Sequence, residues 1–173
     1  MLRPLCISLA TSLFLVACAV EKTQIGTSRD EVVSQYGAPS RTVPLANGSR
    51  LQYSRQPMGQ TAVMVDLDAA GKVVSVRQVL TANDFARIEV GKWTREQTEQ
   101  EFGRPAYISH FANWRGDILT YRWQHHGTDM LFYVHLDLNN VVQQVGQAFE
   151  YREPRESNIS KLRPARLGSA HRS

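Results

Sequence analysis

Two stretches of the chain share the same order of polar, apolar and turn-forming positions, and each predicts a short helix with defined ends. They run Ser28-Arg-Asp-Glu31-Val-Val-Ser-Gln-Tyr36-Gly37-Ala-Pro39 and Thr94-Arg-Glu-Gln97-Thr-Glu-Gln-Glu-Phe102-Gly103-Arg-Pro105. In each, a hydroxyl residue can cap the first turn, and a Glu or Gln three residues later can complete a capping box. A glycine then ends the helix and a proline prevents its continuation. The chain is therefore predicted to be a tandem repeat with helices at 28–36 and 94–102.

Alternating or β-branched apolar positions after each helix predict three strands per repeat. The expected strands are 50–55, 62–68 and 73–80 in the first repeat, and 118–123, 130–137 and 141–151 in the second. A further capped helix of about two turns is expected from Thr81 to Ile88, and the segment between Pro39 and the Asn47-Gly48 turn is interpreted as a polar loop. The predicted fold class is α+β, with two tandem units that each pack a helix on a three-stranded antiparallel meander.

The repeat also predicts which positions correspond. Tyr36 and Phe102 are expected at equivalent core positions, whereas Glu99 is expected on the outer face of its helix. The register of the last strand is ambiguous, because both alternate sets of positions mix polar and apolar residues, and a β-bulge there would explain the pattern.

The N-terminus indicates a targeting segment. A basic start at Arg3 precedes an apolar run that is too short to span a bilayer, and Leu15-Val16-Ala17-Cys18 resembles a bacterial lipobox. Residues 1–17 are therefore predicted to be a lipoprotein signal peptide, and Cys18 the acylated N-terminal residue of the mature chain. Ala19 in place of aspartate favours an outer-membrane address facing the periplasm. The alternative is an ordinary signal peptide that is cleaved after Ala17.

Charge is concentrated at the C-terminal end. Residues 152–173 hold six Arg or Lys residues against two Glu, whereas residues 18–151 hold 13 basic and 14 acidic groups. The neutral body and the lack of a nucleic-acid-binding motif argue against a nucleic-acid partner. Residues 152–173 are predicted to be a disordered basic tail that either has no partner or contacts anionic lipid headgroups. The predicted units are residues 18–80 and 81–151.

The segment from Asp84 through Gly91, Thr94 and Gln97 to Phe102-Gly103-Arg-Pro105 resembles the BamE (SmpA/OmlA) family of outer-membrane lipoproteins. The resemblance implies two short helices followed by three antiparallel strands, a lipid anchor, and support of the outer-membrane β-barrel assembly machine. The tandem arrangement is also similar to the beta-lactamase inhibitor proteins, which bind through a concave sheet. The sequence departs from the BamE pattern where Lys92-Trp93 separates Gly91 from Thr94, and where Thr98 replaces the family valine.

The residues offer little for catalysis. His125, His126 and Asp129 are possible metal ligands, but adjacent histidines in a hairpin turn point apart. His135 and Asp137 lie two residues apart, but the first repeat has Asp66 and Asp68 there, which favours a structural role. With no nucleophile motif or phosphate loop, we expect a non-enzymatic protein without a cofactor or a metal.

The remaining candidate is a sheet surface. One set of strand residues is expected to face away from the helices: Met64, Arg77, Ile118, Arg122, Leu131, Tyr133 and His135. Aromatic, Met and Arg side chains are typical of protein-binding patches, unless another element covers them. The sequence therefore predicts an outer-membrane lipoprotein that binds envelope proteins, with the barrel-assembly machine as the candidate partner. The alternative is a periplasmic inhibitor or ligand-sequestering protein.

Overall fold

A computed structural model describes residues 22–151. The described chain is α+β and contains two four-stranded antiparallel sheets, with strand orders β1-β2-β3-β4 and β5-β6-β7-β8. The elements are α1 (Arg29–Tyr36), β1 (Arg41–Leu45), β2 (Gly48–Ser54), β3 (Ala62–Leu67), β4 (Val73–Gln78), α2 (Ala82–Phe85), α3 (Arg95–Phe102), β5 (Tyr107–Ser109), β6 (Ile118–His125), β7 (Thr128–Leu136) and β8 (Val142–Phe149). The predicted signal peptide, Cys18 and the basic tail lie outside the described residues. Within residues 22–151, no helix is long and apolar enough to cross a membrane.

Both predicted helix caps are present. Ser28 accepts a hydrogen bond from the Glu31 backbone while the Glu31 side chain accepts from the Ser28 backbone, and Thr94 and Gln97 form the same capping box. Gly37 and Gly103 follow the helices at φ angles of 82° and 79°, a conformation that an L side chain rarely adopts. The start and stop signals of α1 and α3 were therefore correctly predicted from the sequence.

The repeat extends to individual hydrogen bonds. Tyr53 and Tyr121 each donate their hydroxyl to the carbonyl of the glycine that ends the helix before them, over 3.1 Å to Gly37 and 3.0 Å to Gly103. Asp68 and Asp137 each accept two backbone N–H groups in the turn before the last strand. This turn role for Asp137 matches the structural interpretation of the His135–Asp137 pair.

The three-stranded prediction was wrong by one strand in each unit. β1 and β5 occupy the segments that directly follow the two prolines, and each pairs with the next strand along the chain. Only Val43 is buried in β1, and β5 has three residues, none of them buried. Neither segment therefore has the apolar alternation that identifies a half-buried strand.

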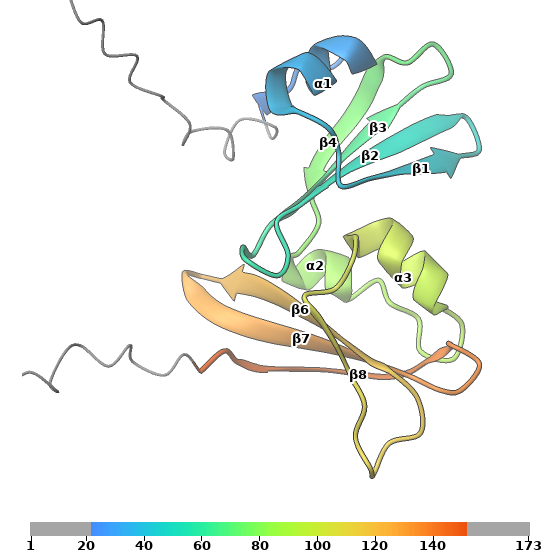
Figure 1. The fold of residues 1–173 in the computed structure, drawn as a ribbon, viewed down its shortest axis with the longest axis vertical. Helices are drawn as coiled ribbons and strands as arrows, with labels where there is room; N and C mark the ends of the chain where they lie inside the picture. Colours follow the sequence, from blue (N-terminus) through green and yellow to red (C-terminus); the bar gives the residue numbers. More distant parts are fainter. Residues whose placement is uncertain (1–21, 152–173) are drawn as a thin grey trace, which may run out of the picture.

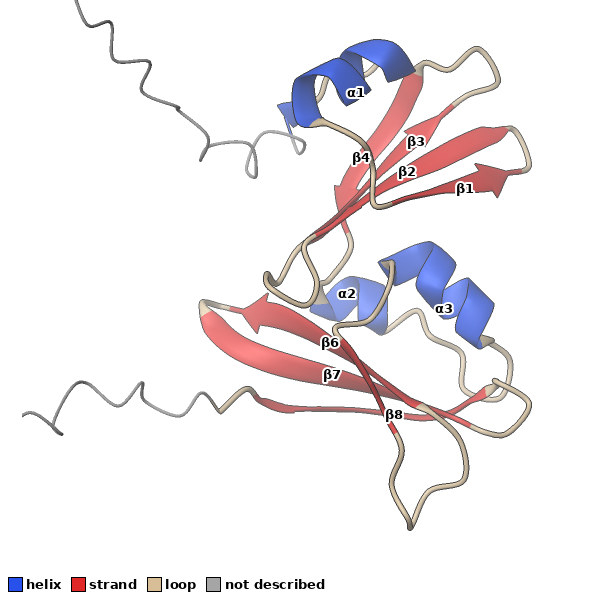
Figure 2. Cartoon of the chain, viewed as in Figure 1, coloured by secondary structure: helices blue, strands red, loops and turns tan. Residues whose placement is uncertain are grey.

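The sheets and helices alternate in layers, as Figure 2 shows. Helix α1 covers one face of the first sheet, where Val32 packs in a cluster with residues of β2, β3 and β4. Helices α2 and α3 lie between the two sheets. A second cluster joins Met64 and Leu80 of the first unit to Phe102, Tyr121 and other side chains of the second, so the two units share a core.

The equivalence of Tyr36 and Phe102 holds in position but not in burial. Phe102 is fully buried, whereas Tyr36 is only partly buried against the α1 cluster. The expectation for Glu99 was wrong, because its carboxylate lies between the units and bonds Arg95 at 2.9 Å and Arg41 at 3.6 Å. Helix α3 packs against a sheet on each of two sides, so the face that points away from its own sheet contacts the first sheet and not solvent.

The register of the last strand is explained by a bulge. His135 pairs with Gln144, and the next residue, Leu136, pairs with Val142, so Gln143 is extra on β8. The same shift occurs at the equivalent place between β3 and β4. Beyond this bulge, β8 continues as a regular strand to Phe149.

Candidate functional site

The surface predicted from the sequence is divided between two places. Met64 and Arg77 are paired neighbours on β3 and β4, and they lie on the face of the first sheet that meets α2 and α3. Met64 is 1% exposed, and Arg77 bonds Asp84 of α2 at 3.0 Å. These two residues face the contact between the units, away from the outer face of the second sheet, so neither belongs to the candidate site.

The other five predicted residues lie together on the outer face of the second sheet. Ile118 pairs with His135, and Arg122 with Leu131, while Tyr133 lies between them on β7 opposite Thr120. Along β7 the burial alternates, with Met130, Phe132, Val134 and Leu136 buried beneath α2 and α3 and the intervening residues only partly buried. The alternation predicted this face correctly because strand residues two apart share a face.

The loop between β5 and β6 turns part of this face into a hollow. The Trp114 indole donates to the Leu136 carbonyl at 2.8 Å, which holds its ring edge-on to His135 with the centroids 5.0 Å apart. The hollow has a volume of about 490 Å³ and is lined by Phe111, Asn113, Trp114, Ile118, Tyr133, His135 and Gln144. Phe111 is 56% exposed at its rim. The lining is mainly aromatic and apolar, with three polar side chains that can orient a ligand.

His135 is the chemically distinct group in the hollow. Its Nδ1 is buried and has no hydrogen-bond partner among the described residues. Burial lowers the pKa of the imidazole, because the low-dielectric surroundings disfavour its charged form. At neutral pH the ring is therefore an uncharged polar group that can receive or donate one hydrogen bond to a bound molecule.

Arg122 lies on the same face, but its guanidinium is already bonded to other residues of the protein. Its guanidinium bonds Glu150 at 2.6 Å and also donates to the Pro57 carbonyl. The Gln56 side chain bonds both backbone groups of Arg122, donating to its carbonyl at 2.6 Å and accepting from its N–H at 3.1 Å. The β2–β3 loop of the first unit thus binds the edge of β6, and Arg122 is 7% exposed.

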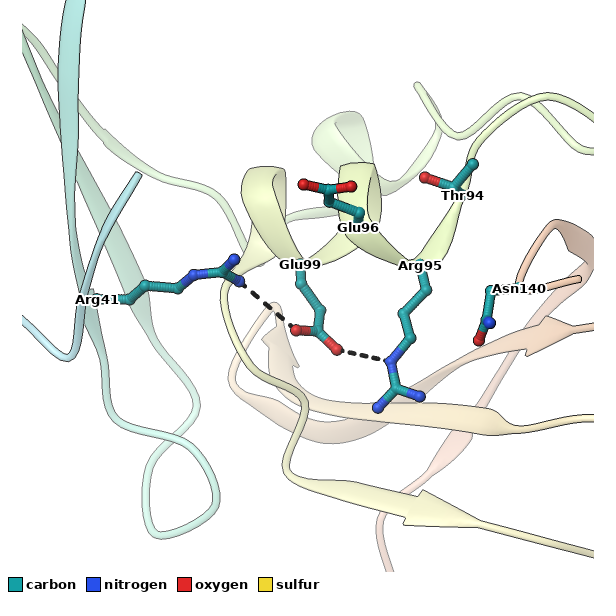
Figure 3. A pocket seen from close by; sticks show the side chains of 6 residues that line it. All are labelled: Arg41, Thr94, Arg95, Glu96, Glu99 and Asn140. Atoms are coloured by element: carbon teal, nitrogen blue, oxygen red, sulfur yellow. Dashed lines mark hydrogen bonds and ion pairs between the residues drawn. The ribbon is translucent and has the colours of Figure 1, made fainter. Parts of the chain in front are cut away.

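A second, polar hollow lies where α3 meets the first sheet. Figure 3 shows Glu99 between Arg41 and Arg95, bonded to both. Arg95 also bonds Asp117 at 2.8 Å. Arg41 and Arg95 are both bonded to carboxylates of the protein itself, so these side chains are best explained as part of the contact between the units.

The two candidate histidine ligands contact each other, so the expectation that they point apart was wrong. His125 and His126 lie in the β6–β7 turn with ring centroids 4.3 Å apart. Within residues 22–151, no group of three or more His, Cys, Asp or Glu residues could hold a metal ion.

Several site residues were not assigned from the sequence. Phe111 and Trp114 form the rim and wall of the hollow, and Gln56 holds the edge of β6. Two aromatic residues in an otherwise polar loop were a visible signal. The contact of Trp114 with His135 depends on how the loop folds back over the sheet, and the loop sequence has no periodic pattern that predicts this.

Comparisons with known proteins establish no family for the chain. No protein-family model and no curated protein matches the sequence. Among solved structures, the chain is similar to a DUF4309 family protein (YjgB) from Bacillus subtilis subsp. subtilis str. 168, with 15% sequence identity and a TM-score of 0.31. The match covers 72% of this chain and 79% of the other.

Proposed function

We propose that the protein is a non-catalytic binding module of the bacterial envelope, and that it binds a protein partner through the outer face of the second sheet. The observation that carries the proposal is the hollow formed by Trp114, Tyr133 and His135. Aromatic side chains at a partly desolvated, concave site are the usual centres of binding energy in protein interfaces. The polar residues at its margin fit an interface with an apolar centre and a hydrated rim.

The contrast between the two sheets supports this choice of face. The first sheet is covered on one side by α1 and on the other by α2 and α3. The second sheet has these helices on one side only, and Tyr107 and Phe111 are 51% and 56% exposed on or beside its other side. Exposed aromatic residues next to an apolar hollow are typical of an interaction site.

The location and partner class come from the sequence. A lipid attached to Cys18 would anchor the chain in the outer membrane, facing the periplasm, and several acyl chains together make a durable anchor. The resemblance to the BamE family favours the barrel-assembly machine as the partner. The proposed role is support of outer-membrane protein assembly or of envelope integrity.

Site-specific photocrosslinking tests the binding face. The full chain would carry benzoylphenylalanine in place of Phe111, with a control in which the same residue replaces Val74, which is 52% exposed on the first sheet. We expect a crosslink to a component of the barrel-assembly machine from position 111 and none from position 74. A soluble periplasmic enzyme as the sole product would favour the inhibitor function. Equal crosslinking from both positions, or none, would refute the binding face.

A separate experiment tests the anchor. Cys18→Ser in the full chain should abolish labelling by a fatty-acid probe and release the protein from membranes. A Cys18→Ser chain that stays labelled and membrane-bound would refute lipidation at this residue.

A further inference from the structure

The two sheets have four edge strands, and three of them carry features that discourage pairing with another strand. β1 contains Arg41 and Pro44, and β4 contains Arg77. β5 is only three residues long. Charges, proline and short length are the means by which sheet edges are protected from intermolecular pairing.

The fourth edge strand, β8, lacks these features. It is eight residues long, with the sequence Val-Gln-Gln-Val-Gly-Gln-Ala-Phe, and contains no charged residue and no proline. Its bulge is confined to the first two residues. Gln143, Gln147 and Ala148 are exposed, and Phe149 is 75% exposed at the end of the strand.

The pairing of β8 with β7 fixes which backbone groups are directed outward. The Glu150 N–H bonds the Asp129 carbonyl on the β7 side, and N–H and C=O directions alternate along a strand. Val145, Gln147 and Phe149 therefore direct theirs away from the sheet. Within residues 22–151, no hydrogen bond to these outward groups is found, whereas the start of the strand is covered by Trp93, which bonds Val142 at 2.8 Å.

We propose that β8 pairs antiparallel with β8 of a second copy of this chain, which joins two second-unit sheets into one continuous sheet. Two-fold pairing places the same edge against itself, so an edge with a net charge would oppose like charges. The neutral β8 avoids this repulsion. The Gln143 and Gln147 amides can bond across the junction, and Phe149 would be covered by the partner strand.

The other candidate occupant within the chain is residues 152–173. This segment contains Pro154 and Pro164 and six basic residues against two acidic ones. Proline and dense like charge oppose strand pairing, so a second copy is the better occupant. The proposal is independent of the binding face, because pairing along the edge of β8 leaves the outer face of each sheet open.

Two readouts on the full chain test the proposal, namely light-scattering mass in detergent and crosslinking by a short bifunctional thiol reagent. Gln147→Cys should give a crosslinked dimer, whereas Thr42→Cys, on the exposed edge strand β1, should give only the background of the unsubstituted chain. Gln147→Pro removes an outward N–H that has no bond in the single chain, so the chain should fold but dimerise about tenfold less tightly or not at all.

Gln147→Lys serves as a second variant, because it places like charges across the junction without constraining the backbone. We expect it to lower the dimer fraction with an unchanged melting temperature of the monomer. A monomeric mass at every concentration tested would overturn the proposal. A dimer that resists both substitutions, or that crosslinks equally from position 42, would also overturn it.

Discussion

Truncation of Phe102 to alanine tests the shared core most directly. Phe102 is fully buried, and its ring centroid lies 5.1 Å from Phe85, 5.9 Å from Tyr121 and 6.1 Å from Trp93. The same cluster contains Met64 and Leu80 of the first unit. Removal of this ring therefore weakens the packing within the second unit and the contact between the units at once.

The expected cost follows from burial. Truncation of a buried Phe to Ala destabilises a protein by about 3–5 kcal/mol, against a total stability of roughly 5–15 kcal/mol for a domain. Tyr36 occupies the equivalent position but is only partly buried, so Tyr36→Ala should cost about 1–2 kcal/mol. The repeat alone predicts equal costs, and the structure predicts unequal ones.

Urea unfolding measures both costs when it is followed by far-UV circular dichroism, which reports both units, and by tryptophan fluorescence, which reports the second unit, where Trp123 is 2% exposed and packs edge-on against Phe85. A shared core predicts one cooperative transition that moves to lower urea in Phe102→Ala. Glu96→Ala, at an exposed position of α3, is the control and should change stability by less than about 0.5 kcal/mol. Equal losses for Tyr36→Ala and Phe102→Ala, or two separate transitions, would contradict the reasoning.

Three further predictions concern single residues. Gly48→Ala and Gly116→Ala should each destabilise the fold by about 2 kcal/mol or more in urea unfolding, because both glycines have positive φ and a Cβ would collide with a backbone carbonyl of the neighbouring strand; wild-type stability in either would contradict this. Gln56→Ala should cost about 1–3 kcal/mol, since it leaves the backbone N–H and C=O of Arg122 without these partners; a loss below about 0.5 kcal/mol would show that water replaces the side chain. Burial lowers the pKa of His135, so as the pH falls the imidazole is protonated in the unfolded chain before it is protonated in the folded one, and stability should fall as the pH drops below about 6.5. His135→Asn should reduce the difference between the melting temperatures at pH 7 and pH 5.5. An unchanged difference would contradict the assignment.

The parts of the fold that depend on local chemistry could be predicted from the sequence. Ser28 with Glu31, and Thr94 with Gln97, define a helix start through neighbours three residues apart. The alternation of Phe132, Val134 and Leu136 with Tyr133 and His135 identified the outer face of the second sheet for the same reason. These signals lie within one element, so they do not depend on the rest of the chain.

The parts that depend on contacts between elements could not be predicted. β1 and β5 are edge strands stabilised by pairing rather than by an apolar face. Glu99 was predicted to face solvent because α3 was expected to pack only on the sheet of its own unit. The sheet of the first unit also contacts α3, on the side that carries Glu99. The wall of the hollow likewise depends on Trp114 reaching a carbonyl of another strand.

Equivalent positions of the two repeats explain why helix α3 contacts the face of the first sheet but not the corresponding face of the second. When Leu51 is aligned with Leu119, Arg50 and Gln52 of the first unit correspond to Ile118 and Thr120 of the second unit. In the first unit, Arg50 bonds Asp66 at 2.6 Å and Glu101 of α3 at 2.9 Å.

Gln52 extends the same contact, because its amide donates to the Glu99 and Gln100 carbonyls of α3, over 3.0 Å to each. This polar contact attaches helix α3 to the first sheet. In the second unit, the pair that corresponds to Arg50 and Asp66 is Ile118 and His135, which cannot form such an ion pair and instead lines the hollow. The equivalent sheet face thus contacts α3 in the first unit and lines the aromatic hollow in the second. This difference supports the proposal that the second unit binds the partner.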